Sequence, residues 1–297
     1  MGAYMGWRYP IYVNSMMLLF VGLPLAIALI EPSRGLSDII QIADVPREYE
    51  HRFRLSDIKI ILSNKSNIYV ALEEFMSTVP QGVMLAWLMQ YVVRELEATE
   101  TVAMIFVGLG MLGGLLGVFV AYATDRLYQR HPRYRPIIAA ASCFAQTVFF
   151  MIFLLLPIKL NITARDPVES AVLFLELLRR STLIQLAVLS FFIGMIFNSS
   201  VEPIKNSVVS DVNLPEQRAI VVSSISTIEL FFRSVGIAIA GLVSDLTGSL
   251  RITLIAFVLL YVVAGKLWLK AAWHYPYDIE RTASRLRERI KNSTTPQ

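Results

Sequence analysis

The sequence predicts an all-α polytopic membrane protein, in which one transmembrane helix precedes a six-helix bundle. Hydrophobic residues make up 55% of the 297 positions and charged residues only 17%, which is too apolar for an ordinary soluble domain. Seven apolar stretches approach the ~20 residues that a helix needs to cross a ~30 Å hydrocarbon core. Because backbone groups in lipid must bond to one another, such stretches are predicted to be helical. They are Ile11–Ile30, Ile68–Val93, Val102–Thr124, Pro136–Leu155, Leu183–Val201, Ile220–Leu242 and Ile252–Leu269.

Polar intervals between these stretches divide the chain. Residues 1–32 are expected to hold the first helix, 33–67 a cytoplasmic linker, 68–272 the six-helix bundle and 273–297 a cytoplasmic tail. Two shorter helices are expected in the polar parts. Leu55–Leu62 is predicted as a surface helix in the linker, and Glu169–Arg180 as an amphipathic helix in the longest outside loop.

Positive charge is distributed unevenly between the two predicted faces of the membrane. If the chain leaves the first helix into the cytoplasm, 19 of its 27 basic residues lie on that side. This asymmetry predicts an outside amino terminus and a cytoplasmic carboxyl terminus, in a cell membrane. A basic tail can also bind nucleic acid, but a tail beside lipid headgroups accounts for the same charges. Membrane lipid is therefore the expected partner, and nucleic acid is not.

A glycine-rich segment lies inside the third apolar stretch. Gly108, Gly110 and Gly113 spell GxGxxG, and Gly114 and Gly117 follow. Nucleotide binding would need a preceding strand and a later acidic residue, whereas this motif lies in a membrane-length apolar run. Small residues four apart let two helices approach closely, so helix packing is the preferred interpretation.

The turn after this stretch carries the most specific motif, AYATDRLYQRHPRYR over residues 121–135. An acidic residue at a helix end, followed by an arginine-rich turn, can lock neighbouring helices together. The segment resembles the cytoplasmic signature of the major facilitator superfamily (MFS), broadly Gly-x-x-x-Asp-Arg-x-Gly-Arg-Arg. Ala121 and Tyr128 stand where that signature has glycines. The resemblance assigns a cytoplasmic gating role to Asp125, Arg126 and Arg130.

Other stretches resemble the same superfamily in the order and spacing of its helices 6–12. They are WRYP from Trp7, EPSRG from Glu31, DVNLPEQR from Asp211 and GLVSDLTG from Gly241, and FMSTVPQGVMLAWLMQY from Phe75 most resembles the spinster-like branch. The resemblance implies an MFS half-bundle and secondary active transport of a small organic solute by alternating access. It also implies a missing amino-terminal half, or another copy of the chain, as a partner, and the spinster-like branch implies an amphipathic or lipid-like solute.

Charged residues inside the predicted helices are candidate substrate or coupling sites, because each costs energy in lipid unless it faces a cavity or a partner. Glu229 and Arg233 lie four residues apart near the middle of one helix. They either line a cavity or form an internal ion pair that only hides two charges.

Two further helices carry candidate site residues. Glu73 and Glu74 precede Gln81 and Pro80 on one helix, and at most one of the two glutamates can point squarely into a cavity. Partial burial favours a protonated carboxyl, which suits proton coupling, although pairing with Lys59 or Lys65 is the competing interpretation. On another helix, a polar face either lines a site or forms a solvated helix end. Its residues are Asn198, Glu202, Lys205 and Asn206.

Conventional catalysis is not predicted. The three histidines are scattered, and the chain has no Gly-x-x-x-x-Gly-Lys-Ser/Thr loop, so no enzyme, metal site or cofactor is expected and gradients are the expected energy source. Alternative interpretations are a seven-helix receptor or retinal protein, with Lys266 in its last helix, a self-assembling or non-transporting membrane protein, and a gene remnant.

Overall fold

The computed structural model describes residues 8–28, 61–164 and 166–294, and within these ranges all regular secondary structure is helical. Six helices of the described part are long and apolar enough to cross a membrane. The prediction of a helical protein with membrane-length apolar helices is therefore confirmed. The chain separates into two units, Met1–Asp44 and Val45–Gln297. The linker residues 29–60, with the EPSRG motif and most of Leu55–Leu62, lie outside the described ranges.

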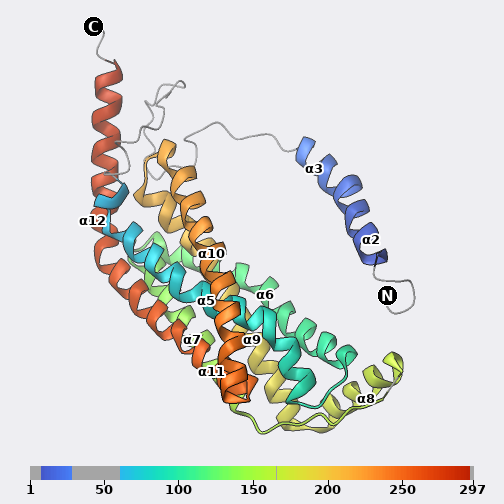
Figure 1. Cartoon of the computed structure of the whole chain (residues 1–297). Helices are drawn as coiled ribbons and strands as arrows, with labels where there is room; N and C mark the ends of the chain where they lie inside the picture. Colours follow the sequence, from blue (N-terminus) through green and yellow to red (C-terminus); the bar gives the residue numbers. More distant parts are fainter. Residues whose placement is uncertain (1–7, 29–60, 165, 295–297) are drawn as a thin grey trace. The chain divides into compact units, whose positions relative to one another are not determined.

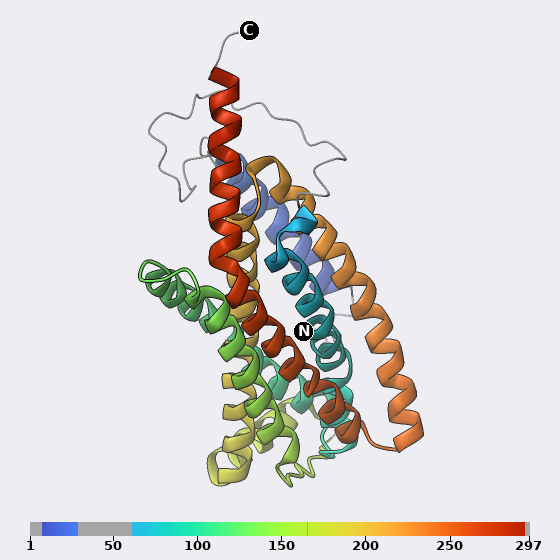
Figure 2. The same ribbon diagram turned by 90° about the vertical axis from the view of Figure 1, so that its left-hand side faces the viewer.

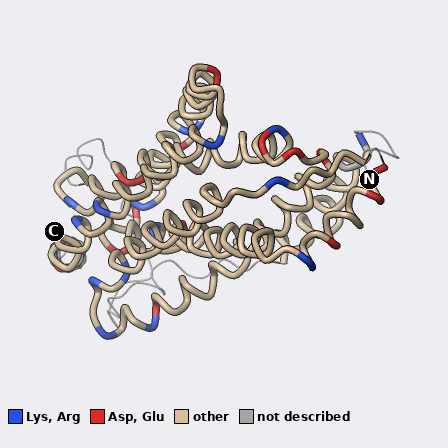
Figure 3. The backbone as a smooth tube through the Cα atoms, turned by 90° about the horizontal axis from the view of Figure 1, so that it is seen from below, with Lys and Arg blue, Asp and Glu red and all other residues tan. Residues whose placement is uncertain are grey.

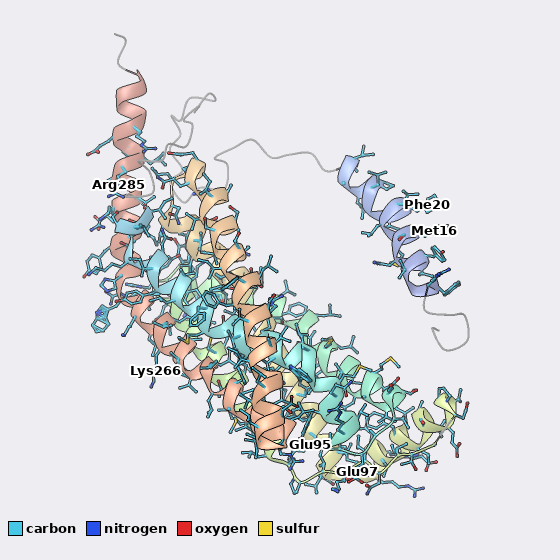
Figure 4. All side chains as sticks on the ribbon, in the orientation of Figure 1. Met16, Phe20, Glu95, Glu97, Lys266 and Arg285 are labelled. Atoms are coloured by element: carbon cyan, nitrogen blue, oxygen red, sulfur yellow. The ribbon has the colours of Figure 1, made fainter. Side chains whose placement is uncertain are left out.

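The described part of the first unit is one apolar helix, built from α2 (Tyr9–Met17), the π-helical turn η1 (Leu18–Gly22) and α3 (Leu23–Ala28). Pro24 has no N–H to donate to the carbonyl of Phe20, and a wider turn accommodates this missing bond. Its large apolar side chains are exposed, and Figure 4 shows Met16 and Phe20 projecting from the helix. Lipid can cover such a surface on all sides.

The second unit is a helical bundle. Within it α9 packs against α6 and α7, while α5 packs against α10 and α12 (Figure 1). The helices are α5 (Lys65–Arg94), α6 (Glu100–Tyr128), α7 (Tyr134–Leu155), α8 (Pro167–Arg180), α9 (Thr182–Val212), α10 (Pro215–Thr247), α11 (Leu250–Val258) and α12 (Leu260–Thr294).

Helix α5 is more polar than the apolar segments of the other long helices. The predicted segment Ile68–Val93 does form a helix, but α5 is not among the six that are apolar enough to cross a membrane. The polar side chains of Glu73, Glu74 and Gln81 lower its apolar character. Fourteen residues of α5 are buried, so protein rather than lipid surrounds much of this helix.

The amphipathic helix predicted at Glu169–Arg180 is confirmed as α8, which begins two residues earlier. The Asp166 carboxylate caps it by accepting a hydrogen bond from the Glu169 N–H at 3.0 Å. Arg179 and Arg180 occupy its last turn, where positive charge complements the helix dipole. This helix lies at the end of the bundle opposite the carboxyl terminus (Figure 1).

Contacts between loops and helix ends close the end of the bundle at which α8 lies. The Glu95 carboxylate accepts hydrogen bonds from the Ser249 hydroxyl at 3.1 Å and the Arg251 N–H at 3.0 Å. Glu97 forms an ion pair with Lys159, and both glutamates are labelled in Figure 4. The loops after α5 and α7 are thereby tied to the start of α11.

Helix α12 continues well beyond the apolar segment that the sequence marks. It runs without interruption from Leu260 to Thr294, so the expected boundary between bundle and tail at residue 272 falls inside one helix. Figures 1 and 2 show it crossing the bundle and projecting past the neighbouring helix ends. Figure 3 shows that charged positions are sparse along the middle stretches of the helices.

The glycine-rich stretch of α6 packs closely against another helix, as predicted, and the structure identifies that helix as α9. A Cβ at Gly113 would overlap the carbonyl oxygen of Phe192, and one at Gly117 would lie 2.8 Å from the carbonyl oxygen of Ile196. Gly108, by contrast, has no heavy atom within 4 Å of the corresponding position. Close packing, not nucleotide binding, therefore explains the later glycines of the motif.

Gly113→Ala should destabilise the protein by roughly 1–3 kcal/mol, because a backbone oxygen of α9 would have to move. Gly108→Ala adds the same methyl group in open space and is the matched control. Its stability should stay the same or rise slightly, since alanine favours a helix by roughly 0.5–1 kcal/mol over glycine. Thermal unfolding in detergent micelles measures both, and equal midpoints for the two variants would contradict this packing.

Candidate functional site

The candidate site lies where α5, α9 and α10 bring ionisable side chains together. We describe positions in the site by their distance from one end of the bundle. We call this the basic end and define it by Arg135, Asp211, Pro215 and Tyr275. Both α5 and α10 begin at this end, and α9 ends there.

The first cluster joins α5 to α10. The guanidinium of Arg233 pairs with the Glu229 carboxylate and donates a hydrogen bond to Gln81 Oε1 at 2.9 Å. Gly82 makes room for this arrangement, because a Cβ there would collide with the Arg233 side chain. Gln81 and Arg233 lie roughly 25 Å along their helices from the basic end, near the middle of each.

The second cluster joins α5 to α9. The Lys205 ammonium lies 2.6 Å from Glu74 Oε2 and 2.6 Å from Glu202 Oε2. Lys205 and Glu74 are almost completely buried, with side chains 4% and 6% exposed, whereas Glu202 is mostly exposed. The two clusters share helix α5, on which Glu74 and Gln81 lie seven residues, about 10 Å, apart.

Glu73 has no ion-pair contact with this cluster in the described part of the chain. Its side chain is almost completely buried, and neither carboxyl oxygen has a partner within hydrogen-bond geometry among the described residues. Ser77 is one turn away on the same helix. Glu73 and Glu74 therefore diverge, as the helical geometry predicts: one has an ionic partner and the other has none.

The polar face predicted on α9 divides into two parts. The Asn198 amide donates a hydrogen bond to the Tyr261 hydroxyl at 3.1 Å, which ties α9 to α12. Asn206 instead donates to the exposed carboxylate of Glu202 at 3.3 Å. Only Glu202 and Lys205 of this face join the ionic cluster with α5.

The predicted gating motif is only partly assembled. Asp125 pairs with Arg135 at 2.8 Å, and Arg135 also pairs with Asp211. Arg126 donates instead to the Tyr122 hydroxyl at 3.2 Å on its own helix, and Arg130 is exposed. The motif therefore contributes Asp125 to an inter-helix junction, without Arg126 or Arg130.

Residues that were not among the predicted site residues complete this junction. The Tyr275 hydroxyl donates to Asp211, and the Arg135 guanidinium lies 3.8 Å from the centre of the Tyr128 ring. Nearby, Asn67 and Asn213 exchange hydrogen bonds of 2.8 Å through their side-chain amides. The only feature of the sequence that marks these residues is their position near helix ends. That position does not indicate which helix ends lie together in the fold.

An apolar groove of about 570 Å³ runs between the basic-end halves of α5 and α10. Asn67 and Ser224 are the only side chains in its lining that carry polar groups. Ile228 and Phe232 line it on α10 and each precedes a member of the Glu229–Arg233 pair in sequence. The groove thus reaches the helical turns of α10 that carry the first cluster.

Among the described residues, no group of three or more His, Cys, Asp or Glu side chains could hold a metal ion. His131 accepts a hydrogen bond from the Arg133 N–H at 3.1 Å, and His274 stacks on Tyr69. His51 lies outside the described residues.

Comparison of the chain with protein-family models and with curated proteins finds no match in either.

The buried pair of Lys205 and Glu74 should behave as a unit. Lys205→Met should destabilise the protein by about 3–5 kcal/mol, because it leaves Glu74 as a buried charge without its partner. Adding Glu74→Leu should recover most of that loss. A double-mutant cycle on thermal unfolding in micelles measures the coupling. Additive single effects would show that the two groups do not depend on each other.

Proposed function

We propose that the chain is the carboxyl-terminal part of a secondary active transporter of the major facilitator type, which moves a small organic solute across a membrane by alternating access. One observation carries the proposal: two ionic clusters that share α5 lie between α5, α9 and α10, in a protein with six membrane-length apolar helices in its described part. Charged groups at such positions are costly unless they serve a pathway or pair with one another.

The proposed solute combines a charged group with an apolar part. The Glu229–Arg233 pair and the Glu202–Lys205–Glu74 group offer both signs of charge, and the apolar groove adjoins the former. Lys205 already bridges two carboxylates, so a cationic solute can compete for one of them without leaving a buried charge unpaired. Exchange of ion partners, not covalent chemistry, is the proposed mechanism.

Glu73 is the proposed proton carrier. Burial without a hydrogen-bond partner makes an ionised carboxylate costly, so the protonated form is the one that this surrounding stabilises. Proton release would then require Glu73 to gain water or a charged partner in another conformation. Access of water or of a charged partner to Glu73 is then the step that couples solute movement to a proton gradient.

The orientation follows from charge. The basic end, with the Asp125–Arg135–Asp211 junction, is proposed to face the cytoplasm, and α8 to lie outside. The junction joins α6, α7 and α9 at that end, so its opening is the proposed cytoplasmic gate. An amino-terminal half, or a second copy of the chain, would supply the facing side of the pathway.

Arg233→Gln and Glu229→Gln should each reduce transport at least about tenfold, because each leaves the other charge unpaired beside the pathway. Uptake of a radiolabelled organic cation, an organic anion and a sugar into vesicles containing the full chain would be measured under a proton gradient. Lys159→Gln, at the opposite end, is the control. If the Arg233→Gln variant took up solute at the wild-type rate per molecule, the pair would have only a structural role.

Glu73→Gln should abolish uptake driven by a proton gradient while preserving exchange of labelled for unlabelled solute, because glutamine mimics the protonated carboxyl but cannot release a proton. Glu97→Gln, a glutamate at the α8 end, is the control. The two modes would be compared in the same vesicles. Gradient-driven uptake that persists in Glu73→Gln would assign proton coupling to another group.

A further inference from the structure

Helix α12 carries an exposed stripe that the proposed transport mechanism does not use. Lys266, Lys270, Trp273 and Tyr277 follow one another at spacings of four, three and four residues, and all four are exposed. This spacing places them on one face of the helix. Trp268 and Tyr275, on the face opposite, are fully buried against the bundle. The stripe therefore faces away from the protein, and Figure 4 shows Lys266 at the outer edge of the bundle.

The position of the stripe relative to the membrane follows from Tyr275. Its hydroxyl bonds to Asp211 in the polar junction, and we place the end of the apolar part of the bundle at the level of this junction. Trp273 and Tyr277, with 68% and 63% of their surface exposed, flank that level on the lipid-facing side. Exposed Trp and Tyr side chains favour the boundary between hydrocarbon and headgroups.

The two lysines lie on the hydrocarbon side of this boundary. By helical rise, Lys270 is roughly 5 Å and Lys266 roughly 10 Å deeper than Trp273. Neither has an ion-pair partner in the described part of the chain, and α12 contains no acidic residue from Leu260 to Tyr277. Unpaired ammonium groups at this depth are stabilised when their long side chains extend toward the headgroups and reach negative charge there.

We infer that Lys266, Lys270, Trp273 and Tyr277 form a binding site for the headgroup of an anionic phospholipid in the leaflet at the basic end. The lysine ammonium groups donate hydrogen bonds to the phosphate oxygens. The two aromatic rings lie beside the glycerol region of the same lipid. Charge complementarity selects this occupant, because two cations without acidic neighbours attract an anionic headgroup more strongly than a zwitterionic one. The site is independent of the proposed transport function.

Fluorescence quenching by brominated lipid tests the site directly. The full chain would be placed in phosphatidylcholine vesicles that contain either brominated phosphatidylglycerol or brominated phosphatidylcholine at equal mole fraction. Subtracting the signal of Trp273→Phe isolates the contribution of Trp273 among the four tryptophans. The anionic lipid should quench Trp273 with at least about fivefold higher apparent affinity.

Two charge-matched variants complete the test. Lys266→Gln/Lys270→Gln should abolish the preference for the anionic lipid, whereas Arg179→Gln/Arg287→Gln removes the same charge from exposed positions elsewhere and should retain it. Circular dichroism would verify folding, and Lys270→Gln alone would replace the double variant if that variant failed to fold.

Three results would overturn the inference. They are equal quenching by both lipids, a preference that survives Lys266→Gln/Lys270→Gln, and a Trp273 that neither lipid quenches. The last result would show that protein, such as a second copy of the chain, covers the stripe instead of lipid.

Discussion

The arrangement of this bundle depends on the need of each buried charge for a partner. Lys205 can be buried only because Glu74 and Glu202 both lie 2.6 Å from it. That contact fixes α5 against α9, and the Glu229–Arg233–Gln81 contact fixes α5 against α10. Because α5 serves both clusters, a small rotation of this helix would disturb both at once. The polar side chains of α5 thus determine how three helices are arranged.

The two ends of the bundle are held in different ways. At the basic end, polar side chains from several helices meet in the Asp125–Arg135–Asp211 junction and the Asn67–Asn213 pair. Toward α8, Phe106, Phe153 and Phe174 are buried together, beside the polar contacts of Glu95 and Glu97. Packed aromatic rings resist gradual deformation, whereas ion pairs and amide pairs can exchange partners with water. The buried polar junction therefore distinguishes the basic end, because its contacts can exchange partners where the aromatic cluster cannot.

The sequence predicts the helices better than it predicts their contacts. Apolar stretches and the amphipathic pattern of α8 locate the helices, and the glycine spacing predicts close packing of α6 against another helix but not that this helix is α9. The pairing of Glu229 with Arg233 is also readable, because both lie on one helix four residues apart. Sequence alone cannot pair Glu74 with Lys205, 131 positions away, or choose which of Glu73 and Glu74 is paired. Such choices depend on how helices are rotated and packed, which a single sequence does not encode locally.

The bent course of α12 has a mechanical consequence. Its 35 residues include Pro276, which removes a backbone hydrogen bond inside the helix, and Figures 1 and 2 show the outer part running in a different direction from the part that crosses the bundle. The outer part is attached to the start of α5 through Ser66 and Asp278, and to the start of α10 through Glu216 and Arg289. Because both attachments lie beyond Pro276, a change of angle at this proline would move the beginnings of α5 and α10 together while the apolar part of α12 stays packed in the bundle.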